Sequence, residues 1–520
     1  MLQGVLVSAA FLLTSALSGV ATAQGGYIAE ANALYDDIAD ERNSAPVLLP
    51  ALANMTAAPA IATDPGSLRL LTPESSAWPE VERWVTATPQ QDALDALRAV
   101  TEGEDYLAAM AFAQPYGASG IAVEFIRAGL YTELGDPPLL ADADHGYLEP
   151  MRTLALLVQA EAKRLASEGN VAAGLDLLFS LMVLGRQLAD REFVVEAATG
   201  YAFMGSATRR MRELVYVDFK GDQAVSLEGL RDIIEKLDRE GQLAIDRLSF
   251  PRADRIAAEQ IIAFTYEERG GIRRPEFIQT MTRLSTSGRP LRRFAASARW
   301  SEAADTQVDW FDIREALEKA YSGWTRRWLL EPGSPVLNLP FPVQEFSDTE
   351  RYAAVAMSLR TIGSDLFDLR DAVEVERVGT RLSFAVLGRY YEQGRYPTSL
   401  ADVRPRWISE IESDAFDDPS ALTDAKDEMH FFVPVRDDYV ADMRDDPEPH
   451  FMEVFPGDGT NFGLELYEDQ FVLYSVGPNA ADDNAARVHT DFQSQFGDYL
   501  VWPPVVGLQR EHLRQVGGLD

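Results

Sequence analysis

The sequence predicts an α+β protein in two parts. A large, all-α irregular helical array occupies residues 24–345, and a small α+β domain with an antiparallel sheet occupies residues 346–520. Apolar residues recur with helical spacing as far as about Glu392. After Gly394, turn residues, aromatic residues and short apolar runs dominate, which is typical of antiparallel strands. At 520 residues the chain exceeds the size that one hydrophobic core usually serves, so two or more domains are expected.

The first 23 residues are predicted to be a secretory signal peptide. An apolar run from Val5 to Val20 precedes a small-residue cleavage site, Ala21-Thr22-Ala23. We expect cleavage before Gln24, a periplasmic or secreted bacterial protein, and no stable membrane span afterwards. The alternative is that the run is retained as a membrane anchor, for which it is short. We expect no other stretch that is long and apolar enough to cross a bilayer.

Composition narrows the possible functions. The chain is 46% hydrophobic and 25% charged, as in globular proteins. It has no cysteine, which excludes thiol catalysis, iron–sulfur clusters and cysteine zinc sites. A protein of this size that is exported without disulfides fits a bacterial periplasm or exterior. The net charge of −35 argues against general nucleic-acid binding.

The clearest helical unit is an αα-hairpin. One helix starts near Met151 and ends at Gly169, and the returning helix begins at Asn170, a favourable N-cap residue. The unit is similar to tetratricopeptide-like hairpins, but the sequence has no fixed repeat period, so an irregular array is expected. Pro79 and Pro89 are predicted to lie in the first turns of two earlier helices.

A basic stretch interrupts this acidic chain between Arg269 and Arg299. We expect its arginines to face carboxylates of the same protein, with the run Asp437–Glu448 as one candidate. The alternative is that the stretch docks onto an anionic surface or an acidic partner. Its members are Arg269, Arg273, Arg274, Arg283, Arg289, Arg292, Arg293 and Arg299.

The C-terminal part is predicted to begin with helical structure and to continue as a small sheet. The spacing Ser347-Asp348-Thr349-Glu350 is that of a capping box, and helical periodicity then runs to Tyr391. Gly457-Asp458-Gly459 is predicted to be a hairpin turn. The predicted strands are His430–Val435, Phe451–Phe455, Gly463–Tyr467 and Phe471–Val476.

Several motifs in this part occur in a familiar order. They comprise a Tyr-x-x-x-x-Gly-x-Tyr-Pro-x-Ser-Leu helix end, an Asp-Pro step, Tyr-Ser-x-Gly, and an acidic loop. The matching residues are Tyr390 or Tyr391, Gly394, Tyr396, Pro397, Ser399, Leu400, Asp418, Pro419, Tyr474, Ser475, Gly477, Asp482, Asp483 and Asp498. With them, the stretch Glu374–Trp502 resembles the globular domain of the type II secretion major pseudopilin family (protein G-like).

The resemblance implies a fold and a bound metal ion, but it does not imply the function of a pilus subunit. In that family the acidic loop binds calcium, so Asp482, Asp483 and Asp498 are the implied Ca²⁺ ligands, and oxygen ligands suit that ion. The alternative is a solvated acidic loop. The family's membrane-helix N-terminus is missing here. We therefore expect no processing or polymerisation as a pilin subunit.

No catalytic motif is evident. The sequence lacks a nucleophile elbow, a P-loop, a Gly-x-Gly-x-x-Gly fingerprint and a His-Glu-x-x-His helix. His430, His450 and His489 share the C-terminal domain, but a chance distribution explains them. Asp142, Asp144 and His145 form a dense polar cluster that is better explained by turn chemistry than by acid–base catalysis.

The sequence therefore favours a non-enzymatic exported scaffold or binding protein of the bacterial cell envelope. Its partner would be an unidentified envelope or secreted protein. One alternative is a secreted polysaccharide hydrolase or lyase that uses carboxylates of an α/α helical domain. Another is an accessory factor of a type II secretion-like apparatus, which the resemblance alone suggests.

Overall fold

The structure is a computed structural model, and part of the chain is described. The described residues are 26–63, 65–103, 110–239, 241–286, 292–332, 334–338, 350–359, 365–416, 428–437, 449–492 and 494–518. The predicted signal peptide, Ser347–Thr349 of the predicted capping box, Arg289, the Asp418-Pro419 step and nearly all of the run 437–448 lie outside them.

Helices make up most of the described chain. Residues 26–33 are helical at its start. The longer helices that follow are α2 (Ala45–Asn54), α5 (Trp78–Val85), α6 (Thr88–Thr101), α8 (Leu148–Ser167), α9 (Val171–Ala189), α10 (Val194–Lys220), α11 (Leu227–Lys236), α12 (Ala253–Thr265), α13 (Arg274–Thr286), α14 (Arg293–Ala303), α15 (Trp310–Trp328), α18 (Asp365–Gln393) and α19 (Val505–Val516). The short helices are α3 (Ala60–Thr63), α4 (Pro65–Leu70), α7 (Val123–Arg127) and α17 (Ala353–Leu359).

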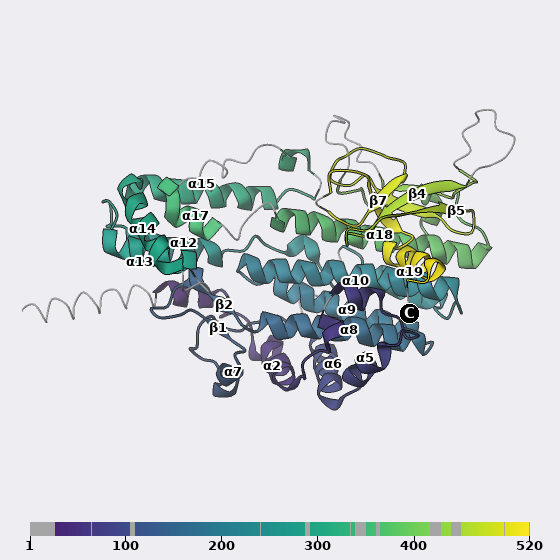
Figure 1. Cartoon of the computed structure of the whole chain (residues 1–520), viewed down its shortest axis with the longest axis horizontal. Helices are drawn as coiled ribbons and strands as arrows, with labels where there is room; N and C mark the ends of the chain where they lie inside the picture. Colours follow the sequence, from purple (N-terminus) through teal and green to yellow (C-terminus); the bar gives the residue numbers. More distant parts are fainter. Residues whose placement is uncertain are drawn as a thin grey trace, which may run out of the picture.

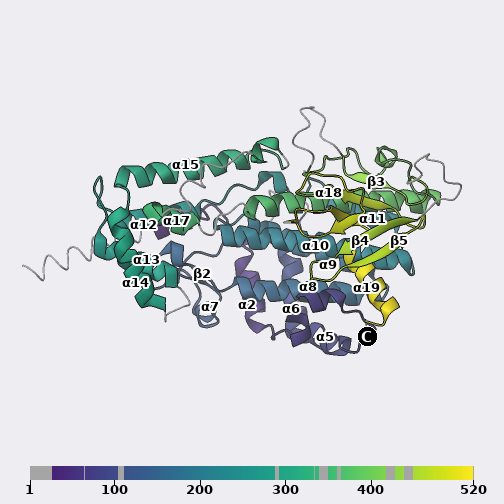
Figure 2. The same ribbon diagram turned by 45° about the horizontal axis from the view of Figure 1, so that its top comes forward.

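The helices stack in layers along the long axis of the molecule (Figure 1). Helices α8, α9 and α10 lie side by side, α2, α5 and α6 pack beneath them, and α18 covers the other side of α10. A group formed by α12–α15 and α17 occupies one end, as the turned view also shows (Figure 2). The sheet and α19 occupy the other end, so the two groups are separated by the length of α10 and α18.

The predicted αα-hairpin is confirmed. Helix α8 ends at Ser167, and Gly169 adopts φ +81°, a conformation that favours glycine. The Asn170 side chain then accepts a hydrogen bond from the Ala173 N–H and caps α9. The prolines of α5 and α6 lie in their first turns, also as predicted.

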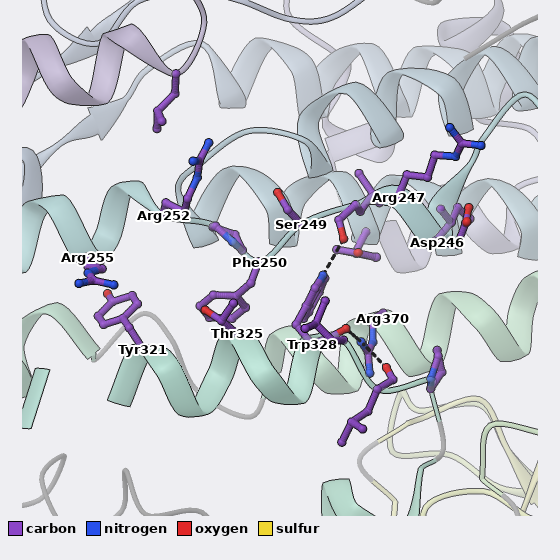
Figure 3. Close-up of a pocket in the computed structure, with 18 of the residues that line it drawn as sticks. Asp246, Arg247, Ser249, Phe250, Arg252, Arg255, Tyr321, Thr325, Trp328 and Arg370 are labelled. Atoms are coloured by element: carbon purple, nitrogen blue, oxygen red, sulfur yellow. Dashed lines mark hydrogen bonds between the residues drawn. The ribbon is translucent and has the colours of Figure 1, made fainter. Parts of the chain in front are cut away.

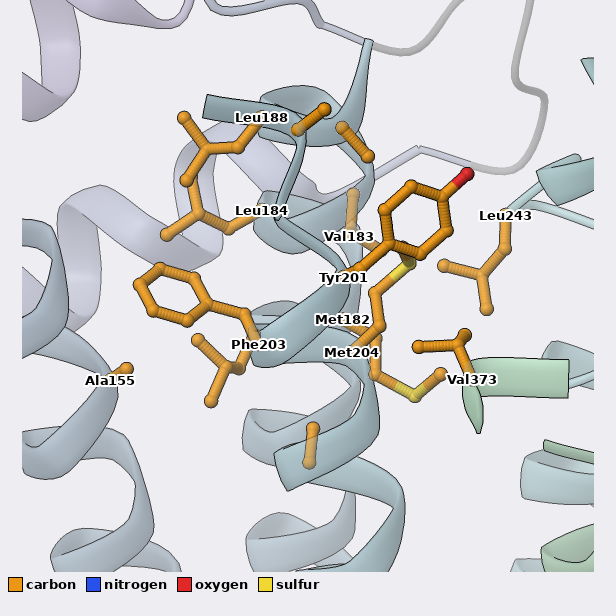
Figure 4. Packing of buried hydrophobic residues seen from close by; sticks show 14 of the residues in the cluster. Ala155, Met182, Val183, Leu184, Leu188, Tyr201, Phe203, Met204, Leu243 and Val373 are labelled. Carbon is orange, nitrogen blue, oxygen red and sulfur yellow. The ribbon is translucent and has the colours of Figure 1, made fainter. Parts of the chain in front are cut away.

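Helix α10 packs into the centre of the hydrophobic core. Figure 4 shows Tyr201 and Met204 of α10 on the side of Val373 of α18, and Phe203 of α10 on the side of Ala155 and Leu184. Gly185 of α9 faces Gly200 of α10, and a Cβ on either glycine would collide with the backbone of the other helix. The two helices can approach this closely because neither position carries a side chain.

Six strands form one sheet against α18. They are β3 (His430–Phe432), β4 (His450–Phe455), β5 (Phe462–Leu466), β6 (Val472–Ser475), β7 (Arg487–His489) and β8 (Asp498–Trp502). Their order is β3-β6-β8-β7-β4-β5. The four predicted strands are present, and β4 and β5 pair around the predicted hairpin turn.

The sheet is mixed, so the prediction of an antiparallel sheet is wrong in part. The other strand pairs are antiparallel, but β7 lies between β4 and β8 and runs parallel to both. Strands β4 and β8 run in the same direction, so β7, which pairs with both, can be parallel to each of them. A separate two-stranded antiparallel sheet joins β1 (Thr132–Glu133) to β2 (Asp144–His145) within the helical part.

The chain turns from α18 into the sheet where the motif Gly394–Leu400 was noted. Gly394 has φ +68° and ends the helix. The Tyr396 ring stacks on Tyr390 at 4.5 Å between centroids, and its hydroxyl donates to the Asp469 carbonyl oxygen. This turn therefore ties the end of the helix to the loop before β6.

One hydrophobic cluster runs through both parts of the chain. It begins in α2, continues through α8–α10 and α18, and reaches Trp502 of β8. The predicted domain boundary near residue 345 falls among residues that the structure does not describe, and it stays a prediction.

The sequence analysis expected no stretch after the signal peptide that is long and apolar enough to cross a bilayer, and helix α9 contradicts this expectation. By length and apolar composition alone, it is long enough to cross a bilayer, and it is the one such helix among the described residues. Most of its apolar window, 72%, is buried inside the protein. This burial is what a central core helix shows.

Candidate functional site

The acidic loop after β6 brings the three predicted calcium ligands into one region. The Asp498 carboxylate is buried and accepts backbone N–H groups of Asp483 (3.1 Å) and Ala485 (2.7 Å). The Asp482 carboxylate accepts the Tyr474 hydroxyl at 2.9 Å and the Asn484 N–H at 2.7 Å. Two of the three carboxylates thus have protein donors.

These contacts fit a calcium site only in part. Within the described residues, no group of three or more histidine, aspartate or glutamate side chains is arranged to hold a metal ion. Burial raises the pKa of Asp498 to about 7, against the hydrogen bonds from the two backbone N–H groups. Calcium therefore stays a prediction of the resemblance.

The polar cluster at Asp142 and His145 is structural. Asp142 accepts a hydrogen bond from Arg283 Nε at 2.6 Å. The His145 ring is buried, with Nδ1 3.3 Å from a carboxylate oxygen of Glu196. The Glu196 carboxylate also accepts hydrogen bonds from Tyr116, Tyr147 and Arg191. The loop thus lies over a buried ion pair. Asp142 is held by its ion pair with Arg283, which the predicted turn chemistry did not include.

Three of the seven described arginines of the basic stretch are neutralised inside the protein, so the first alternative is confirmed for those three. Arg274 pairs with Asp305, Arg283 with Asp142, and Arg299 with Glu350. The predicted partner run 437–448 is described only at Asp437, which pairs with Arg436 instead. Arg292 and Arg293 are exposed at the start of α14.

A cavity with aromatic walls was not anticipated from the sequence. It has a volume of about 1050 Å³ and lies between the segment 245–252, α12, α15 and α18. Phe250, Tyr321 and Trp328 supply its aromatic surface, and Arg370 of α18 stands beside Trp328 (Figure 3). Concave, partly apolar cavities with a few polar groups are the usual ligand sites of proteins.

Arg370 is the unusual group in this cavity. Its side chain is only 8% exposed and lies 4.7 Å from the Trp328 ring centroid. Nη1 donates to the carbonyl oxygens of Trp328 (3.0 Å) and Leu330 (3.2 Å). Nη2 is buried and has no acceptor among the described residues. A buried donor without a partner costs about 1–3 kcal/mol. An acceptor placed against Nη2 would therefore be stabilising.

The charge on Arg370 is also poorly balanced. Its ion pair with Asp371 is long, 3.5 Å between Nε and Oδ1. Burial raises the pKa of Asp371 to about 7, so this carboxyl is only partly ionised near neutral pH. By contrast, Arg252 and Arg255 of the same cavity pair with Glu192 and Glu318 at 2.7 and 2.8 Å.

Two of the five carboxylates that line the cavity are held in ion pairs. Glu259 pairs with Arg255 at 3.1 Å, and Glu374 pairs with Arg377 at 2.7 Å. Burial would raise the pKa of Glu374, but the charge of Arg377 outweighs it and lowers the pKa. Glu374 is therefore ionised and poorly suited to donate a proton.

Comparison with known proteins leaves the cavity without a precedent. No family model matches the chain, and neither a curated protein nor a solved structure matches it. The pseudopilin resemblance therefore stays a prediction. The sequence offered no signal for the cavity, because its walls come from elements between residues 30 and 374.

Proposed function

We propose that the protein is a non-enzymatic, exported binding protein of the bacterial envelope whose ligand occupies the cavity beside Arg370. The observation that carries this proposal is Arg370, which lines a cavity of about 1050 Å³ and whose buried Nη2 has no acceptor among the described residues. A carboxylate or phosphate group would supply that acceptor, and charged partners form the stronger hydrogen bonds.

The other residues that line the cavity indicate the chemistry of the part of the ligand that does not contact Arg370. Phe250 packs 5.7 Å from Trp328 between ring centroids, and both rings line the cavity. Aromatic walls favour a ligand with a flat, apolar body. Acidic side chains such as Glu259 and Glu374 also line the cavity, which disfavours a polyanion. The expected ligand is a ring-bearing molecule with one anionic group.

Binding of 2-naphthoate, a probe of this class, tests the proposal. We expect saturable binding by titration calorimetry, and much weaker binding of the neutral isostere 2-naphthamide. Arg370→Gln should weaken naphthoate binding by about tenfold or more, the usual worth of a charged hydrogen bond. Arg127→Gln, which changes an exposed arginine of α7, is the matched control. Equal affinity for acid and amide would refute the proposed anchor.

The polysaccharide hydrolase or lyase is the weaker alternative. A glycosidase needs one carboxyl group with a raised pKa and a second one across the bond. Of the five acids that line this cavity, Glu259 and Glu374 are instead in ion pairs. The neighbouring Asp371, whose pKa burial raises, is paired with Arg370. We expect no release of reducing ends from uronic-acid polysaccharides. Release that Glu259→Gln abolishes would show that the protein is an enzyme.

We also propose that residues 346–520 form a pseudopilin-like module. Support comes from the order of its elements: a long helix, the Gly394 stop, and a sheet whose Ser475 hydroxyl donates to Asp414 at 2.8 Å. This module is the part expected to contact an envelope or secreted protein. A role as an accessory factor of a type II secretion-like apparatus rests on the same resemblance.

Calcium is tested separately. The resemblance predicts that millimolar Ca²⁺ raises the melting temperature relative to EGTA, because an ion that binds only the folded state stabilises it. Asp483→Ala should remove the shift, and Asp222→Ala, at an exposed turn after α10, should not. Equal melting temperatures in Ca²⁺ and EGTA would exclude the site.

A further inference from the structure

Strand β5 forms a free edge of the six-stranded sheet. It is the last strand in the order β3-β6-β8-β7-β4-β5, and among the described residues it pairs only with β4. Figure 1 and Figure 2 show β5 at the outer side of the sheet. In an edge strand, every second residue directs its backbone N–H and C=O groups away from the neighbouring strand. A strand of another chain can pair with these groups.

The outer face of β4 and β5 is exposed and aromatic. Phe451 is 60% exposed and lies opposite Glu465. Its ring lies over Gly463, because a Cβ on that glycine would be 2.8 Å from Phe451 Cζ. Farther along β4, Phe455 contacts Phe496 at 5.1 Å between ring centroids, and Phe496 is 48% exposed. Exposed apolar patches with polar residues at their margins are typical of interaction surfaces.

This face also carries a net negative charge. The Glu465 carboxylate accepts a hydrogen bond from the Tyr467 hydroxyl at 2.9 Å and has no cationic partner among the described residues. Glu453 of β4 lies 3.7 Å from Arg487, and the Arg487 side chain is 64% exposed. The two carboxylates thus have one arginine between them. A partner with basic side chains would complement this surface.

The chain's own segment 438–448 is a poor occupant of this edge. It precedes β4 in the sequence and carries five carboxylates and one arginine. Like charges opposite each other on neighbouring strands are destabilising, so Glu465 would repel an acidic strand and attract a basic one. On the other face of β5, Leu464 is only partly buried against the core. Apolar side chains of an added strand could therefore extend the core at Leu464.

We propose that the edge of β5 binds an extended segment of a partner protein in which basic and apolar residues alternate. The segment would pair with the free N–H and C=O groups of β5. Its basic side chains would lie beside Glu465 and against the ring of Phe451, and its apolar side chains would lie against Leu464. The inference rests on the proposal that residues 346–520 contact a protein partner, and it names the surface and the kind of segment.

A synthetic peptide of alternating lysine and valine, Lys-Val-Lys-Val-Lys-Val-Lys, tests the site on the full chain. We expect saturable binding by fluorescence anisotropy, and about tenfold weaker binding of the peptide with glutamate in place of lysine. Methylation of every internal backbone nitrogen should abolish binding, because it removes the N–H donors and keeps the charges. Equal binding of the methylated peptide would show attraction by charge alone and would overturn the proposal, as would an absence of saturable binding.

A charge reversal on β5 tests the position of the segment. Glu465→Lys should weaken binding of the lysine–valine peptide by about fivefold or more, because it replaces an attractive cross-strand pair by a repulsive one. Glu82→Lys makes the same change of charge at an exposed position of α5, and it should leave the affinity unchanged. Equal affinities of the two variants would contradict a site at β5.

Hydrogen exchange locates the bound peptide. The peptide should slow the exchange of backbone amides in β5 and leave those of β3, the strand at the other edge, unchanged. Protection elsewhere in residues 346–520 would overturn the assignment to β5, while this part would still be the one that contacts partners. No protection in residues 346–520 would overturn both proposals.

Discussion

Arg191→Met is expected to lower the free energy of unfolding by about 3–5 kcal/mol, because it leaves a buried carboxylate without its cation. Glu196 is fully buried, and Arg191 Nε donates to it at 3.0 Å. The guanidinium also lies 4.2 Å from the Tyr35 ring centroid and 4.6 Å from that of Tyr116. A third ring, Phe112, lies 5.7 Å away, so the substitution removes an ion pair and three cation–π contacts at once.

The contribution of this ion pair to folding stability depends on pH through the pKa of Glu196. Burial would raise the pKa of Glu196, but Arg191 and His145 outweigh it and hold the pKa below the ordinary value. A depressed pKa stabilises the folded state at pH values above the ordinary glutamate pKa, and that stability is lost as the pH falls. Stability should therefore fall in acid less steeply for Arg191→Met than for the wild type.

Urea unfolding followed by circular dichroism measures the effect. The control is Arg98→Met, which breaks an exposed ion pair between Arg98 and Asp95. Exposed pairs contribute about 0–1 kcal/mol, so this variant should resemble the wild type. If Arg191→Met were as stable as Arg98→Met, the buried pair would not stabilise the fold.

Gly200→Ala is expected to destabilise the protein by about 3 kcal/mol or more, although alanine is the better helix former. A Cβ at this position would collide with the Gly185 carbonyl oxygen and with the backbone nitrogen of Ala189. Backbone atoms cannot rotate away as side chains can, so α9 and α10 would have to separate. Their separation would open the centre of the core.

A second glycine of the same helix provides the control. The nearest atom to a Cβ on Gly205 is Val373 Cγ2, at 3.6 Å, an ordinary contact. Gly205→Ala should therefore leave the stability unchanged or raise it by up to about 1 kcal/mol. Thermal unfolding of Gly200→Ala and Gly205→Ala measures the difference in their stabilities. Similar melting temperatures for the two would contradict the close approach of α9 and α10.

Local signals predicted local structure well. Gly169 and Asn170 located the turn between α8 and α9, and Gly394 located the end of α18. Alternation and turn residues located β4, β5 and β6. Strands β7 and β8 were not predicted. The three residues of β7, Arg487–His489, carry no pattern of their own. Its position between β4 and β8, which makes the sheet mixed, depends on pairing that sequence periodicity does not encode.

The candidate sites were even less predictable from the sequence than the strand order was. Glu196 looks like any polar residue of an amphipathic helix, and only packing against Tyr116 and Tyr147 reveals a buried charge. Arg370 lies in the stretch predicted to be helical as far as Tyr391. Only the packed structure reveals that its buried Nη2 has no acceptor among the described residues. Unsatisfied groups of this kind are properties of tertiary contacts, so a single sequence does not show them.

The central claim is that the cavity beside Arg370 holds an anionic, ring-bearing ligand, and a crystal structure grown with 2-naphthoate tests it most directly. We predict electron density for the ring against Phe250 and Trp328, with the carboxylate within hydrogen-bonding distance of Arg370 Nη2. An empty cavity, with Nη2 bonded to an acceptor of the protein itself, would contradict the claim.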